Sequence, residues 1–97
     1  MRPVQLADIE VAARVLMAVG ARQRVGIAAQ LIERAALADQ VRLATGKAHP
    51  LFGSGTLMSA ATSLPSSPRP AFLGPDELQA IAIVINGLLA NLHHQSS

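Results

Sequence analysis

Apolar and polar positions follow the period of an α-helix in three separate segments of this chain, most clearly at residues 78–92. Apolar side chains recur in that segment at intervals of three and four residues, which places them in one broad stripe. The stripe consists of Leu78, Ile81, Ala82, Ile85, Leu88, Leu89 and Leu92. Further apolar residues lie outside it, so we predict a long apolar C-terminal helix that other helices or a partner must cover.

The other two periodic segments predict a helix hairpin. They span about residues 6–19 and 22–44, and only two residues separate them. Gly20 and Gly46 follow the two segments, in the position where a helix commonly ends on a left-handed residue. A connection this short favours antiparallel neighbours.

Two irregular segments complete the chain. Residues 47–55 contain Pro50, and a short third helix at about 56–62 follows them, with Ser54 or Thr56 as its N-cap. Residues 63–74 form an irregular loop rich in proline and serine, whose apolar residues we expect to dock in part on the core. Those apolar residues are Leu64, Phe72 and Leu73.

The last helix has a clear start at Gly74, Pro75 and Asp76, with a cap position, proline at the first helical residue and acids in the first turn. No segment alternates as a strand does. The fold class predicted is therefore all-α. It is a small four-helix arrangement in a single domain, residues 1–97, made of the hairpin, the short third helix and the long apolar C-terminal helix.

Composition narrows the setting of the protein. There is no cysteine, which excludes disulfides and thiolate chemistry, and the formal net charge is only +2. The N-terminus lacks the pattern of a signal peptide, and residues 78–92 are shorter than the ~20 apolar residues of a spanning helix. We expect a soluble, cytoplasmic protein. Its core is rich in alanine and has only two phenylalanines, which favours additional burial through a partner.

The segment 45–56 is the sharpest candidate site. Two glycines flank a serine just before a helix, and backbone N–H groups at such a turn can bind an anion or a partner. The candidate residues are Lys47, His49, Gly53, Ser54 and Gly55. The alternative is purely structural: one helix is capped, the next is capped, and His49 hydrogen-bonds to the loop between them.

Metal binding and catalysis have little support in the sequence. His93 and His94 are adjacent, so on a helix they point about 100° apart and chelate one ion poorly. No pattern supplies further ligands, and no nucleophile with a nearby base is apparent. We expect no metal, no cofactor and no catalytic residue, and hence not an enzyme.

Nucleic-acid binding is the alternative class. Five arginines lie on the first two predicted helices, but acids alternate with them and stacking aromatic residues are missing. The candidates for phosphate contacts are Arg14, Arg22, Arg24, Arg34 and Arg42.

Self-association through the last helix is the favoured mode of action. Ile83 and Val84 lie off the main stripe and need cover, while Gly87 and Ala90 are small enough for a second helix to approach. We predict a homodimer or another protein partner, with those four residues at the interface. The alternative is that the loop 63–74 folds over the helix and closes a monomeric core.

Three stretches carry a resemblance to a known family: MRPV at the N-terminus, DIEVAARVL, and TGKAHPLFGSGTLMSAA in the centre. They resemble a family of short, uncharacterised alphaproteobacterial proteins with a central T-G-[RK]-x-H-P-x-x-G-x-G-[ST]-L-M segment, a domain of unknown function. The resemblance implies a bacterial, cytoplasmic, helical protein. It directs attention to His49, Pro50, Gly53, Gly55 and Met58 without giving them a role.

The predicted interface on the last helix and the family resemblance together favour a non-catalytic protein–protein interaction module, such as an adaptor or accessory regulatory subunit. The alternative function is a DNA-associated regulator or packaging accessory protein of a phage-derived system.

Overall fold

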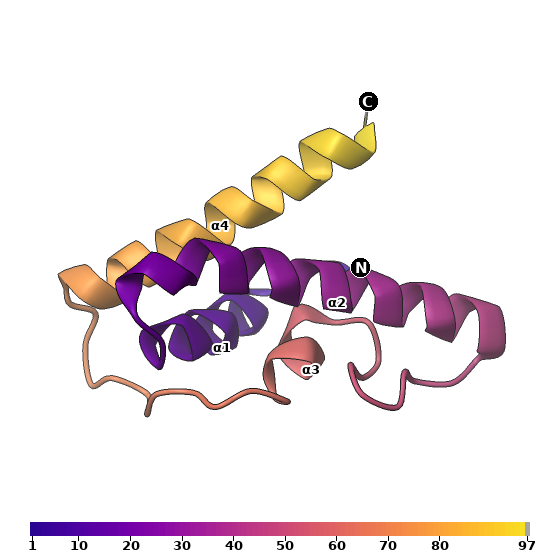
Figure 1. Ribbon diagram of the computed structural model, residues 1–97, viewed down its shortest axis with the longest axis horizontal. Coiled ribbons are helices and arrows are strands. Elements are labelled where there is room, and N and C mark those ends of the chain that lie inside the picture. Colours follow the sequence, from indigo (N-terminus) through magenta and orange to yellow (C-terminus); the bar gives the residue numbers. More distant parts are fainter. Residues whose placement is uncertain (97) are drawn as a thin grey trace.

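The computed structural model describes residues 1–96, with side chains described for residues 1–92. Its described part contains four α-helices, one turn of 3₁₀ helix and no strand, which confirms the predicted helical class. The elements are α1 (Leu6–Met17), η1 (Ala21–Gln23), α2 (Arg24–Thr45), α3 (Leu57–Ala61) and α4 (Pro75–Ser96) (Figure 1).

The two predicted glycine helix ends have different outcomes. Gly46 has φ 74° and donates its N–H to the Arg42 carbonyl, so it is the left-handed residue that ends α2. Gly20 does not play this role. α1 ends at Met17 with Ala18 as its right-handed cap, and Gly20, at φ −63°, leads into η1. The reason is that the connection itself winds into a 3₁₀ turn, which closes onto α2 without a left-handed residue.

A single core lies among the four helices, and it is built largely on alanine. The largest fully buried side chains are Leu16, Leu31, Leu57, Val15 and Val84. The buried alanines are Ala12, Ala13, Ala28, Ala35, Ala38, Ala60, Ala61 and Ala80. Side chains this small let helices approach closely. α1 packs more extensively against α4 and α3 than against α2, its partner in the predicted hairpin.

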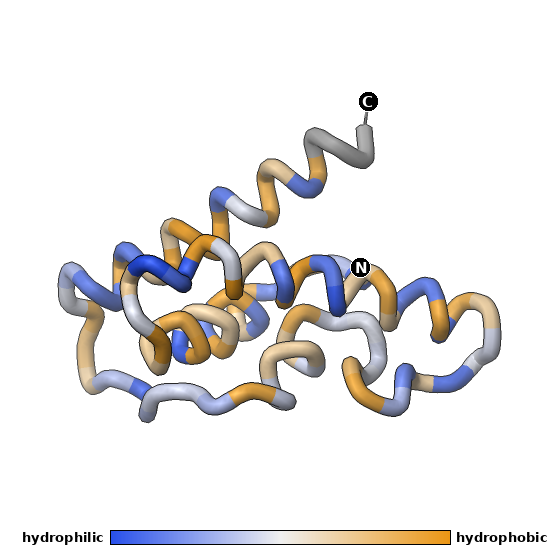
Figure 2. The backbone as a smooth tube through the Cα atoms, viewed as in Figure 1, coloured by the Kyte–Doolittle hydropathy of each residue, from blue (hydrophilic) through white to orange (hydrophobic). Residues whose placement is uncertain are grey.

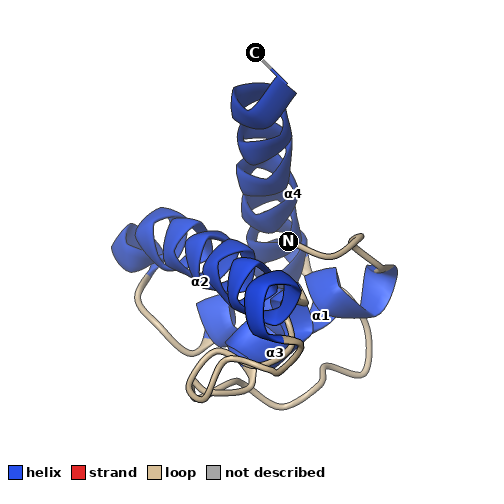
Figure 3. Cartoon of the chain, turned by 90° about the vertical axis from the view of Figure 1, so that its right-hand side faces the viewer, coloured by secondary structure: helices blue, strands red, loops and turns tan. Residues whose placement is uncertain are grey.

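α4 lies across α1 and α2 with its N-terminal half, and its C-terminal half rises away from them (Figures 1 and 3). The buried residues on α4 are Ala80, Val84 and Leu88, at intervals of four, and we call them the core face. Val84 is 1% exposed. It packs inside its own chain, which corrects the prediction that it lies at an interface with a partner.

Most of the predicted apolar stripe points the other way. Leu78 is 52% exposed, Leu89 48% and Leu92 54%, whereas Leu88 is buried and Ile81 packs against the core. Figure 2 shows apolar residues continuing along the part of α4 that stands clear of α2. Polar residues such as Asn86 and Asn91 interrupt them. Within the described chain, no helix is both long enough and apolar enough to cross a membrane.

Candidate functional site

A buried arginine fixes the start of α4 against the rest of the fold. Arg24, 6% exposed, donates from Nη1 to Asp76 Oδ1 at 2.7 Å and from Nε to the Leu16 carbonyl at 3.0 Å. One guanidinium thus connects α1, α2 and α4. The hydrogen bond with Asp76 raises the pKa of Arg24 and lowers the pKa of Asp76, since each charged form stabilises the other. Arg24 is a structural residue, and its assignment to nucleic-acid contact is wrong.

The helix start that the sequence predicted is found at Pro75. The Gly74 N–H donates to Glu77 Oε2 at 3.1 Å, so Glu77 caps the first turn. The sequence placed Asp76 in the first turn of the helix, where the helix dipole favours an acid. It could not reveal the partner of Asp76, because Arg24 lies 52 residues earlier in the chain.

The other candidate arginines are mostly engaged within the chain. Arg14 donates from Nε to the Ser67 carbonyl at 2.9 Å and holds the proline-rich loop on α1. Arg34 lies over the Phe52 ring, 5.1 Å from its centroid. Arg42 has an ion pair with Asp39, so exposed Arg22 is the one candidate arginine for which the described residues show neither a hydrogen bond, an ion pair nor a cation–π contact.

Arg42 pairs with its neighbour on α2. It donates to Asp39 Oδ1 from Nη2 at 2.7 Å and from Nε at 3.1 Å. This hydrogen bonding lowers the pKa of Asp39. The acid three residues earlier therefore neutralises Arg42, as the alternation of charges in the sequence indicated.

The 45–56 segment has the structural arrangement that the sequence left as its alternative. His49 and Gly53 exchange backbone hydrogen bonds of 2.8 and 3.1 Å, which closes a small loop. His49 Nδ1 accepts from the N–H groups of Leu51 and Phe52, and its ring stacks on Phe52 with centroids 4.6 Å apart. In the turn expected to bind an anion, the N–H groups of Gly53 and Ser54 already have acceptors in the chain.

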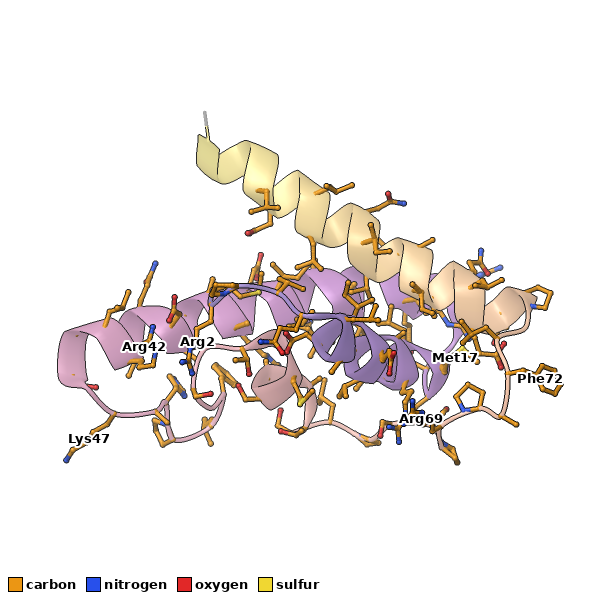
Figure 4. All side chains as sticks on the ribbon, turned by 180° about the vertical axis from the view of Figure 1, so that it is seen from behind. Arg2, Met17, Arg42, Lys47, Arg69 and Phe72 are labelled. Carbon is orange, nitrogen blue, oxygen red and sulfur yellow. The ribbon has the colours of Figure 1, made fainter. Side chains whose placement is uncertain are left out.

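The remaining residues of that candidate site are Ser54, Lys47 and the two glycines. Ser54 donates its N–H to Ser59 Oγ at 3.3 Å, and Lys47 points away into solvent (Figure 4). Gly53 and Gly55 have φ of 84° and 96°. A Cβ on Gly55 would lie 2.8 Å from Asp39 Cα, so the loop needs glycine to approach α2.

Asp8 is a structural residue that the sequence reasoning missed. It is 5% exposed and accepts from the Gln5 N–H at 2.7 Å and from the Met58 N–H at 3.0 Å. It thereby caps α1 and joins it to the start of α3, where Thr56 accepts from the Ser59 N–H. The sequence did place Asp8 in the first turn of a predicted helix, where an acidic residue can cap the helix.

The exposed apolar residues of α4 form the most distinctive surface of the molecule. We call them the α4 stripe. Its members are Leu78, Ala82, Ile85, Leu89 and Leu92. Their spacing of four, three, four and three residues is that of a coiled-coil seam over two heptads. No charged residue lies between Leu78 and Leu92.

Two more apolar side chains continue the α4 stripe at its N-terminal end. Phe72 is 82% exposed and points away from the body (Figure 4), and Leu73 is 56% exposed. Both line, together with Leu78, an open groove of about 700 Å³ between α1, α4 and the proline-rich loop. The expectation that Phe72 and Leu73 dock on the core is wrong, although Leu64 does pack there. The loop is bound to α1 at Arg14 and leaves the stripe open.

The other predicted interface residues line a separate groove between α2 and α4. Ile83, Gly87 and Ala90 contribute to this groove of about 510 Å³, with Ile32 on the opposite wall. A Cβ on Gly87 would lie 3.0 Å from Ile32 Cδ1. The small residue therefore admits α2 of the same chain, which is a different role from the one the sequence suggested.

No group of three potential metal ligands is found among the residues that the structure describes. The side chains of His93 and His94 lie outside the described residues.

Comparison with known proteins gives one match. Neither the curated proteins nor the solved structures include a match to this chain. A family model matches residues 2–88, which is most of the chain and ends within α4. The chain belongs to the family described as Domain of unknown function (DUF7742).

Proposed function

We propose that this protein is a non-catalytic protein–protein interaction module, an adaptor or accessory subunit, that binds its partner through the α4 stripe. The observation that carries the proposal is the spacing of Leu78, Ala82, Ile85, Leu89 and Leu92 on an exposed helix face. A monomer seldom leaves so many large apolar side chains on one contiguous surface. The bacterial cytoplasmic setting implied by the family resemblance belongs to this proposal.

The distribution of polar groups supports it. In the described residues, every buried side-chain nitrogen or oxygen has a hydrogen-bond partner. Buried Asp8 and Arg24 are both used to join helices. An active site usually holds ionisable groups that converge on a cavity. Here the buried ionisable groups Asp8 and Arg24 maintain the fold, and the exposed α4 stripe is apolar.

The DNA-associated alternative receives less support. Phosphate binding requires several arginines free to face one strand. Arg14, Arg24, Arg34 and Arg42 are engaged with groups of the same chain. Arg22 by itself offers little basis for binding a duplex.

A matched pair of variants tests the proposal. Leu89→Lys adds a charge to the α4 stripe, and Ala90→Lys adds the same charge to the next residue, about 100° around the helix. Complexes are crosslinked in the native host and recovered with each variant, and the recovered partner is then purified and recombined. We expect association in wild type and Ala90→Lys and its loss in Leu89→Lys. Equal recovery with all three proteins, or none with any, contradicts the proposal.

A further inference from the structure

The spacing of the α4 stripe restricts what can cover it. A repeat of four and three residues matches the side-chain positions of another α-helix, because two helices that wind around each other meet every 3.5 residues. A strand or an irregular peptide has no such period. Within the chain, α1 and α2 already pack on the opposite side, at the core face of Ala80, Val84 and Leu88. The α4 stripe therefore has the geometry to pack against a further α-helix.

We infer that this helix is α4 of a second copy, and that the protein forms a two-fold dimer through its α4 stripe; the inference rests on the function proposed above. From Leu78 to Leu92 the helix has no charged residue. A second copy therefore meets no like charge, and a partner selected by charge would find nothing to recognise. Gln79 and Asn86 flank the stripe, and their amides both donate and accept, so they are complementary to themselves.

The size of the contact sets the expected affinity. α4 has 22 residues, and at about 1.5 Å per residue it is about 33 Å long and about 10 Å wide. A strip of this size lies below the roughly 800 Å² per partner of a standard interface. Phe72 and Leu73 extend it at one end, through the groove that they share with Leu78. We expect a dimer that dissociates at about 10 to 100 µM.

A free peptide of two heptads would be too short to form a stable paired helix, because isolated helices of fewer than about 12–15 residues barely form in water. The fold removes that difficulty. Arg24 and the core face hold α4 in place before association, so pairing needs little further ordering of the backbone.

The molar mass of the purified protein, alone in solution, tests the inference. Sedimentation is measured from about 5 to about 500 µM, a range that spans the expected dissociation constant. Wild type and Ala90→Lys should change from monomer to dimer over this range, and Leu89→Lys should remain a monomer with an unchanged helical spectrum. A wild-type monomer at every concentration, or a dimer equally weakened by both substitutions, overturns the inference.

Crosslinking provides a second readout that does not depend on a charged variant. The chain has no cysteine, so a single Ile85→Cys introduces one reactive thiol near the middle of the α4 stripe. A short bis-maleimide should join two copies of this variant rapidly, and should join Ala90→Cys much more slowly. Equal rates for the two variants contradict a dimer through this face.

The results separate the inference from the function proposed above. A protein that stays monomeric when purified, yet recovers another protein through Leu89, contradicts the dimer and leaves the interaction module intact. A protein that stays monomeric and recovers nothing contradicts both.

Discussion

Two faces of the same helix are similarly apolar and have opposite roles. The core face of α4 presents Ala80, Val84 and Leu88 to the chain's own core, and the α4 stripe presents larger residues to solvent. Hydrophobicity alone would have placed the stripe inside. The difference shows that the face a helix buries is selected by fit, and here the small residues on α4 match an alanine-rich neighbour.

Two contacts determine which face of α4 is buried. Gly87 lets Ile32 of α2 approach to 3.0 Å of where a Cβ would be. Arg24 holds Asp76 at the start of α4 and the Leu16 carbonyl at the end of α1. With its beginning fixed and its small residues against α2, the helix has one rotation available, and that rotation leaves the stripe exposed.

The largest expected effect comes from charging the two faces in turn. Val84→Lys puts an ammonium into the core and should destabilise the fold by about 4 kcal/mol or more. Ile85→Lys, one residue later and 39% exposed, should change the stability of the monomer by about 1 kcal/mol or less. Thermal unfolding followed by circular dichroism compares them. Similar losses of stability in the two variants would contradict the assignment of Val84 to the core face and Ile85 to the α4 stripe.

The next effect concerns the fit between α2 and α4. Gly87→Leu should cost about 1–3 kcal/mol, because the added side chain must displace Ile32 in a packed contact. Ala90→Leu, on the exposed side of the same groove, is the matched control and should be close to neutral. Urea unfolding measures both. A neutral Gly87→Leu would show that α2 and α4 are not held closely together.

Acid should loosen the anchor of α4. Arg24 lowers the pKa of Asp76 below its usual 3.8, so the folded state favours the ionised carboxylate. That stabilisation is present above the unfolded pKa and is lost as the pH falls through the folded pKa. Stability should therefore fall below about pH 4.

Asp76→Asn isolates this contribution from that of Asp39, whose pKa is also lowered. The variant should be less stable than wild type at neutral pH, and the difference should shrink in acid. A difference that stays constant down to about pH 2 would mean that the pair contributes no pH dependence.

The smallest effect tests the stripe itself. Ala82 is its one small member, so Ala82→Leu adds apolar surface where a partner helix would pack. We expect dimerisation about tenfold tighter, since roughly 1.4 kcal/mol corresponds to a factor of ten in affinity. Sedimentation equilibrium measures it. A weaker dimer, or no change, would place Ala82 outside the contact.

Local features of this fold could be predicted from the sequence. The class, the start of α4 at Pro75, the end of α2 at Gly46 and the capping of α3 by Thr56 all depend on neighbouring residues. Propensity and capping act over a few positions, so a single sequence is sufficient to reveal them.

Long-range features could not be predicted in the same way. The partners of Arg24 and Asp8 lie 52 and 50 residues away, and no local pattern indicates them. The rotation of α4 depends on the same kind of contact. Association through α4 therefore stays a prediction, while Val84, which the sequence assigned to the interface, lies in the chain's own core.

Methyl NMR of the wild-type protein during dilution from about 500 to about 10 µM, across the expected dissociation constant, tests most directly whether two copies pair through the α4 stripe. If the α4 stripe is the contact, methyl signals of Ile85, Leu89 and Leu92 shift with concentration, whereas those of Val84 and Ile83 do not. Signals that stay fixed throughout, or shifts confined to the groove at Ile83, would contradict it.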